Sequence, residues 1–248
     1  MRCKFLGLLV PLLVLTAGVA WAAAPGSGMK GTDHDFSAKG GGVGLCTFCH
    51  TPHRAISTRL LWNHTLSTAT YTWQDQNETI GGTKLPTIAQ SWTGPTKYCL
   101  SCHDGSVAIG DVNWWLAGKP SPLDNEKHAW PDPYNVGATG GTLGNMSGNH
   151  PVAVPYPYQQ AKNTYNGETT GDGVIISEFV ADPGANKIRL FNDTGTLVRA
   201  GAVAGKTGME CSSCHDPHNG STVEDIYFLR GKLKGDSLPY ICLKCHSK

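Results

Sequence analysis

The sequence has little of what would let a polypeptide fold around an ordinary hydrophobic core. Hydrophobic residues make up 40% of its 248 residues, while glycine and proline, which interrupt helices and strands, number 31 and 15. A chain with so many turn-forming residues buries little apolar surface by itself. We therefore expect less regular secondary structure than in an average globular domain.

Two further absences restrict the partners of the chain. The formal net charge is only +1 and no block of lysine and arginine occurs, which argues against nucleic-acid binding. After residue 24 there is no apolar run long enough to cross a bilayer, so we expect no membrane span. Three methionines follow residue 24, and we expect them to serve packing: Met29, Met146 and Met209.

The N-terminus has the pattern of an export signal. Arg2 and Lys4 precede an apolar run at 5–19, and Ala20-Trp21-Ala22 matches a signal-peptidase site. This predicts that residues 1–24 are removed as a signal peptide and that the protein reaches the periplasm and then the cell surface. We treat residues 25–248 as a single domain, which keeps eight of the nine cysteines.

All eight of these cysteines belong to a motif, C-x-x-C-H, that occurs four times. On one helical turn residues i and i+3 share a face, so both thiols can form thioethers with one porphyrin, and the following histidine can bind its iron. The motifs predict four covalently attached haem c groups. The attachment cysteines are Cys46 and Cys49, Cys99 and Cys102, Cys211 and Cys214, and Cys242 and Cys245; the proximal iron ligands are His50, His103, His215 and His246.

A zinc protein is the alternative interpretation of these cysteines. Paired C-x-x-C knuckles build structural zinc sites. However, a zinc site would not explain why a histidine follows the second cysteine in all four motifs.

Six further histidines compete for the four distal iron positions, so every haem can have two histidine ligands. His53 and His218 each lie three residues after a proximal histidine, too close along the backbone to reach the far face of the same haem. We therefore expect each to bind a neighbouring haem. The other candidate ligands are His64, His150 and His34, whereas His128 is expected at the surface.

The interval between the second and third motifs contains a β-rich insertion at about 172–204. Residues 174–180 are β-branched and apolar, residues 187–191 alternate, and residues 196–203 complete a three-stranded meander separated by turn clusters. The predicted fold is a mostly irregular, loop-rich multihaem cytochrome c. Short haem-attachment helices and this small antiparallel meander would wrap around a stack of haems.

Several motif-bearing segments resemble a known group of proteins. The segments are His34-Asp35-Phe36-Ser37, Cys46 to His53, Leu61-Trp62-Asn63-His64, Cys99 to Gly105, Asn149-His150-Pro151-Val152 and Cys211 to His218. They resemble the doubled-C-x-x-C-H cytochromes of metal-reducing bacteria, and most the tetrahaem OmcE-type outer-surface cytochromes. The resemblance implies stacked bis-histidine haems and polymerisation into extracellular filaments, the cytochrome nanowires. In those filaments a histidine of one subunit can bind a haem of the next, and His34 is the candidate for that role here.

The expected function is electron transfer without chemistry on a bound substrate, so we do not expect an enzyme. The expected partners are further copies of the chain in a head-to-tail filament, redox partner cytochromes and extracellular electron acceptors. A soluble periplasmic electron shuttle is the first alternative. A multihaem reductase is the second, and it would need one haem with an open iron position.

Overall fold

In this computed structural model the described residues are 26–37, 45–53, 55, 59–107, 109–113, 135–198, 206–220 and 226–247. Regular structure is scarce in them, as the abundance of glycine and proline predicts. The helices are α1 (Pro95–His103) and α2 (Cys211–Cys214). Short 3₁₀ turns are η1 (Ser27–Met29), η2 (Arg59–Leu61), η4 (Thr139–Gly141), η5 (Tyr158–Gln160), η6 (Ile176–Glu178), η7 (Pro183–Asn186), η8 (Ile226–Phe228) and η9 (Cys242–Lys244).

Short strands form a four-stranded antiparallel sheet of order β1-β6-β4-β5 and a separate hairpin, β2-β3. Loop-rich architecture with a small antiparallel sheet is thus confirmed. The strands are β1 (Val154–Pro155), β2 (Thr164–Tyr165), β3 (Glu168–Thr169), β4 (Leu190–Asn192), β5 (Leu197–Val198) and β6 (Thr207–Met209).

The predicted meander is correct in two of its three strands. β4 and β5 pair within 187–203 as expected, although residues 199–203 lie outside the described part of the chain. The strand predicted at 174–180 is wrong, because this segment contains η6 and Ile175 is 58% exposed. Its end pairs instead with the last motif: the Val180 N–H donates to the Cys245 carbonyl at 2.9 Å. Tertiary contacts overrode β propensity.

Helix α1 begins at a proline, a residue that favours the first turn of a helix. Pro95 occupies the first turn, where its fixed φ suits the helix and its missing N–H is not needed. The helix buries Leu100 and Tyr98 and ends with His103, after which the Asp104 N–H still bonds the Leu100 carbonyl at 3.1 Å. The second C-x-x-C-H motif therefore forms the end of a buried helix.

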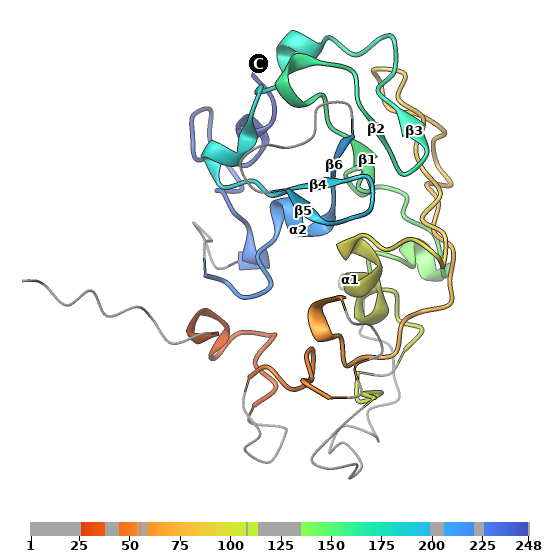
Figure 1. The fold of residues 1–248 in the computed structure, drawn as a ribbon, viewed down its shortest axis with the longest axis vertical. Coiled ribbons are helices and arrows are strands. Elements are labelled where there is room, and N and C mark those ends of the chain that lie inside the picture. The colour runs from red at the N-terminus through yellow and green to blue at the C-terminus, as the bar shows by residue number, and fades with distance from the viewer. Residues whose placement is uncertain are drawn as a thin grey trace, which may run out of the picture.

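The apolar interior consists of separate small clusters. One lies against the four-stranded sheet and includes Tyr156, Leu190 and Met209. A second surrounds Tyr71 and includes Met146, so these two methionines pack in the interior as expected. Figure 1 shows α1 and α2 between the sheet and the N-terminal segment.

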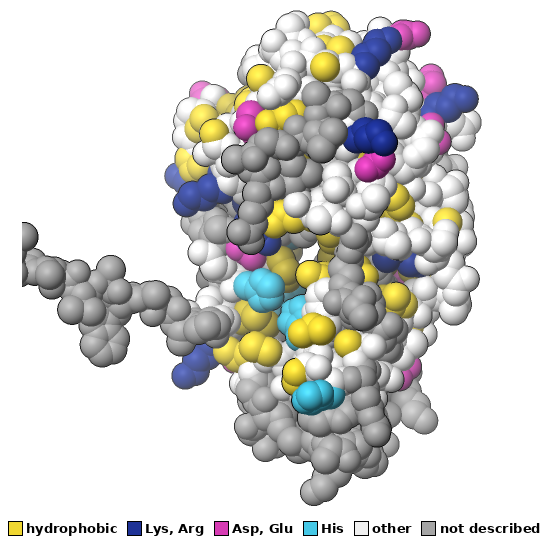
Figure 2. Space-filling model, in the orientation of Figure 1, with side chains coloured by type: hydrophobic (Ala, Val, Ile, Leu, Met, Phe, Trp, Pro, Cys, Tyr) yellow, Lys and Arg dark blue, Asp and Glu magenta, His cyan; other side chains and the backbone are white. Residues whose placement is uncertain are grey.

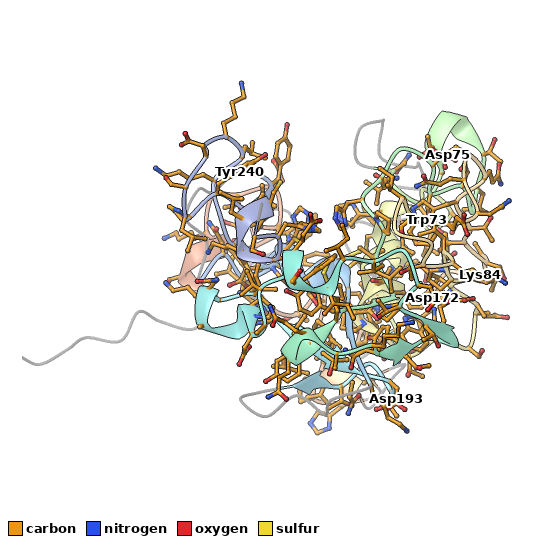
Figure 3. The ribbon with its side chains drawn as sticks, turned by 90° about the horizontal axis from the view of Figure 1, so that it is seen from above. Trp73, Asp75, Lys84, Asp172, Asp193 and Tyr240 are labelled. Atoms are coloured by element: carbon orange, nitrogen blue, oxygen red, sulfur yellow. The ribbon has the colours of Figure 1, made fainter. Side chains whose placement is uncertain are left out.

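Segments that are far apart in the sequence lie on opposite sides of the molecule. Figure 3 places Tyr240, just before the last motif, on the opposite side of the molecule from Trp73 and Asp75. None of the helices among the described residues is long and apolar enough to span a membrane.

Candidate haem-binding sites

Each predicted attachment motif forms a turn of helix. The N–H of the closing histidine donates to the carbonyl of the first cysteine at 2.8 Å in motif I (46–50), 3.0 Å in motif III (211–215) and 2.8 Å in motif IV (242–246). Motif II (99–103) forms the end of α1. This turn places the two cysteines of a motif on one face, as attachment of one porphyrin through two thioethers requires.

The motifs are neighbours in space in the order in which they occur in the sequence. The thiols of Cys99 in motif II and Cys211 in motif III share a hydrogen bond. Cys49 of motif I lies near enough to Cys102 of motif II for ionisation of one thiol to influence the other, and Cys214 of motif III lies equally near motif IV. Figure 1 shows α2 close above α1. The attachment points therefore form a continuous series.

The proximal histidines of motifs I and III are oriented in the same way. The Nδ1 of His50 lies 2.6 Å from the carbonyl oxygen of Leu60, and the Nδ1 of His215 lies 2.5 Å from that of Tyr227. Because a carbonyl oxygen can only accept, each Nδ1 carries the proton and Nε2 keeps its lone pair. This is the arrangement of a metal-binding histidine with its outer hydrogen bond in place.

An unusual backbone conformation supplies both carbonyls. Leu60 and Leu61 have φ of 59° and 50°, and Tyr227 and Phe228 have φ of 57° and 55°. A left-handed conformation costs a residue other than glycine roughly 1–2 kcal/mol. At equivalent places after two motifs, two such residues in succession aim a carbonyl at the imidazole of the proximal histidine.

Two pairs of histidines face each other. The ring centroids of His50 and His218 are 6.0 Å apart, and those of His34 and His103 are 6.1 Å apart. Imidazole nitrogens bind metals at about 2 Å, so two rings on opposite sides of one metal ion have centroids about 6 Å apart. Each pair thus combines a proximal histidine with a distal candidate at a spacing suited to one iron.

Phe228 is a residue that the sequence did not single out. Its ring stacks on that of His34 at 4.5 Å and 18°, while His34 Nδ1 lies 3.4 Å from the Pro217 carbonyl oxygen. The sequence does contain a pair of bulky residues after each of motifs I and III, at 60–61 and at 227–228. The role of these pairs can be recognised only once the backbone turn is known.

The remaining candidates differ in exposure. His64 is 2% exposed, and its Nδ1 lies 2.9 Å from the Thr65 carbonyl oxygen. His150 is exposed, with its Nδ1 2.9 Å from the Pro151 carbonyl oxygen. In both, a carbonyl oxygen lies at Nδ1, as it does in His50, so Nδ1 carries the proton.

His246 and His53 have different surroundings. The ring of His246 packs against Phe179 at a centroid distance of 4.7 Å. His53 lies at the surface, and within the described residues its ring makes no hydrogen bond. His128 lies outside the described residues, so its predicted surface position stays a prediction.

The surroundings of the motifs fit a large apolar group that has polar edges. Leu60 and Tyr227, beside the two proximal histidines, are 52% and 60% exposed. The indole Nε1 of Trp62 is buried, and among the described residues it has no hydrogen-bond partner. Figure 2 shows histidine side chains gathered in a recess among hydrophobic ones. Haem, with its apolar faces and two propionates, matches this combination.

The zinc alternative fits less well. Within the described residues no three cysteine, histidine or acidic side chains converge as a metal site would require. Burial raises the pKa of several motif thiols, to about 11 for Cys49 and Cys214 and to about 12 for Cys245. The eight described cysteines also form no disulfide.

Comparison with known proteins agrees with this chemistry. No protein-family model matches the chain. It is 24% identical over 183 residues to C-type cytochrome OmcS of Geobacter sulfurreducens. The chain resembles a c-type cytochrome. The match covers 74% of this chain and 34% of OmcS, so the chain spans about a third of the length of that relative. This similarity supports a multihaem c-type cytochrome with covalently bound haem.

Proposed function

We propose that the chain is a tetrahaem electron-transfer cytochrome c in which every haem has two histidine ligands. The observation that carries the proposal is the continuous series of four attachment motifs with two facing histidine pairs inside it. Haem c, when bound, supplies one-electron chemistry at its iron. The polypeptide holds the four groups close together, supplies both axial ligands and keeps substrates from the metal.

Two ligand sets follow from the facing pairs. His50 and His218 would hold the haem of motif I, and His103 and His34 that of motif II. His218 thus serves a haem other than the one attached beside it, in line with its three-residue offset from His215. His64 and His150, each with a carbonyl oxygen at its Nδ1, are the candidates for a further distal position within the chain.

The haem content and ligation can be tested on the exported protein. The mass of the mature chain and the pyridine haemochrome spectrum should give four haems per chain, with residues 1–24 absent. The EPR spectrum of the oxidised protein in its assembled form should contain only low-spin signals. A stoichiometric high-spin haem would favour the reductase alternative, because it reveals an open iron position.

We further propose that copies of the chain join head to tail into a filament for extracellular electron transfer. His34 already faces His103 of its own chain, which favours a ligand role within the chain rather than the crossing role expected from the sequence. His53 is better placed to cross. It holds the position after motif I that His218 holds after motif III, and it is exposed.

The equivalent positions of His53 and His218 define the proposed contact between two copies of the chain. His218 of motif III faces His50 of motif I; by the same relation His53 would face His215 of a neighbouring copy. Such a contact joins two different surfaces and does not close, so it propagates into a fibre. Redox partner cytochromes would load the filament, and extracellular electron acceptors would discharge it.

Negative-stain electron microscopy of material sheared from cells tests the filament. Wild-type protein should form fibres, His53→Ala should leave monomers with four attached haems, and His34→Ala should still polymerise while altering one haem of each chain. If the wild-type protein is monomeric, the filament proposal fails and a periplasmic shuttle takes its place.

A further inference from the structure

The first turns of α1 and α2 are joined by reciprocal hydrogen bonds. The Thr96 N–H of α1 donates to Oε2 of Glu210 at 3.0 Å, and the Cys211 N–H of α2 donates to Oγ1 of Thr96 at 3.1 Å. Glu210 directly precedes α2 and also caps that helix through Ser213. Each helix therefore supplies a group that satisfies a free N–H at the start of the other.

The Glu210 carboxylate also binds two side chains from elsewhere in the chain. Its Oε1 accepts from the Tyr165 hydroxyl at 2.6 Å and from Trp92 Nε1 at 3.2 Å. The residue is fully buried. Burying a carboxylate is unfavourable unless donors surround it, and here donors from α1, β2 and the loop before α1 do so.

Close packing holds this carboxylate in place. A Cβ atom added to Gly94 would lie 2.3 Å from Oε1 of Glu210, and one added to Gly208 would lie 2.2 Å from the Tyr165 ring. Both glycines are thus required for the approach of the surrounding backbone. The carboxylate sits in a closed cradle with no room to change its partners.

This cradle lies where two haem-attachment motifs meet. Cys211 follows Glu210 in the chain, and its thiol shares a hydrogen bond with that of Cys99, one turn into α1. Any change in the relative position of the two helices therefore changes the separation of motifs II and III. The proposed function uses neither Glu210 nor Thr96 as a ligand.

We infer that Glu210 and Thr96 are positioning residues that set the geometry between the haems of motifs II and III. The inference rests on the proposed function, because it concerns the spacing of groups that the motifs attach. The hydrogen bonds between the first turns of α1 and α2 would thereby determine the position of motifs I and II relative to motifs III and IV.

Isosteric substitutions separate this role from general stability. Thr96→Val removes the acceptor for the Cys211 N–H at nearly constant volume, whereas Thr96→Ser keeps it. Glu210→Gln keeps the shape but, in either orientation of the amide, places its NH₂ group against an N–H that cannot accept, that of Thr96 or that of Trp92. Glu168→Gln, at a carboxylate outside the cradle, is the matched control.

The measurement is the haem–haem exciton couplet in the Soret circular dichroism spectrum of holoprotein, recorded together with the haem count and the reduction potentials. Thr96→Val and Glu210→Gln should lose part of the couplet amplitude while keeping four low-spin haems, with the larger loss for Glu210→Gln. Thr96→Ser and Glu168→Gln should match the wild type.

The outcomes distinguish the inference from the proposed function. An unchanged couplet in Thr96→Val, or an equal change in Thr96→Ser, overturns the positioning role, and so does a lowered unfolding midpoint with an unaltered couplet. A wild-type protein without four haems overturns the proposed function itself. If Glu210→Gln fails to mature, the comparison of Thr96→Val with Thr96→Ser decides.

Discussion

Motif I and motif III share one local structure but stabilise it differently. In both, a side chain beyond the left-handed turn donates to the carbonyl of the second motif residue: Asn63 Nδ2 to Thr47 at 2.6 Å, and Arg230 Nε to Ser212 at 3.3 Å. At motif I the donor, Asn63, is neutral. Around motif III the arginine also forms a buried ion pair.

That ion pair joins Arg230 to Asp216, with Nη1 3.4 Å from Oδ2 and both side chains nearly inaccessible. The position equivalent to Asp216 is Thr51, whose hydroxyl bonds the His53 carbonyl at 2.8 Å. The comparison indicates that the backbone turn, not the charge, is what the two sites have in common. A buried pair at one of them makes that site far more sensitive to loss of a single partner.

The largest effect is expected from the histidines that follow the two motifs. His218→Ala should convert the haem of motif I to a high-spin state in every chain, because His218 faces His50. His53→Ala should not change the spin state of any haem in an isolated monomer, because the haem that His53 would bind belongs to a neighbouring copy. EPR of monomeric protein measures both. Low-spin His218→Ala protein would contradict the ligand pairing.

Arg230→Ala should strongly destabilise the protein. It leaves the carboxylate of Asp216 buried without its cation, and breaking a buried pair costs about 3–5 kcal/mol. Urea unfolding of the holoprotein, followed in the Soret band, should show a large fall in the midpoint. Replacing both partners, as Asp216→Asn with Arg230→Met, should recover much of the loss; no recovery would show that the charge pair is not the cause.

Asn63→Ala should have a smaller effect of the same kind. It removes the neutral hydrogen bond from Asn63 to the part-buried Thr47 carbonyl, a loss of about 1–2 kcal/mol. The same unfolding measurement applies. If Asn63→Ala lowered the free energy of unfolding as much as Arg230→Ala, the two sites would not differ as described. The stabilisation would then come from the backbone turn and not from the ion pair.

The smallest effect is expected from Phe228→Leu. Phe228 stacks on His34, while Leu61 holds the equivalent position after motif I. Leucine should let the His34 ring rotate without releasing the iron, so the g-values of one low-spin EPR signal should shift while the haem count and the unfolding midpoint stay nearly constant. Appearance of a high-spin signal would mean that the stacking is needed for ligation.

Much of the site could be predicted from the sequence. The motif turns follow from spacing alone, because a three-residue offset puts two side chains on one helical face. The scarcity of regular structure follows from composition. The strand predicted at 174–180 failed because β propensity is local, whereas the contact of Val180 with Cys245 joins distant parts of the chain.

The sequence by itself determined the number of attachment motifs, the cysteines and histidines in each, and the surplus of histidines over distal positions. Only the tertiary structure decided that His34 faces His103, that His218 faces His50 and that Glu210 links the two helix starts. The physical reason is the distance along the chain between the groups that must meet. Covalent attachment depends on atoms within one helical turn, while an axial pair or a buried carboxylate requires groups that only the folded chain brings within reach.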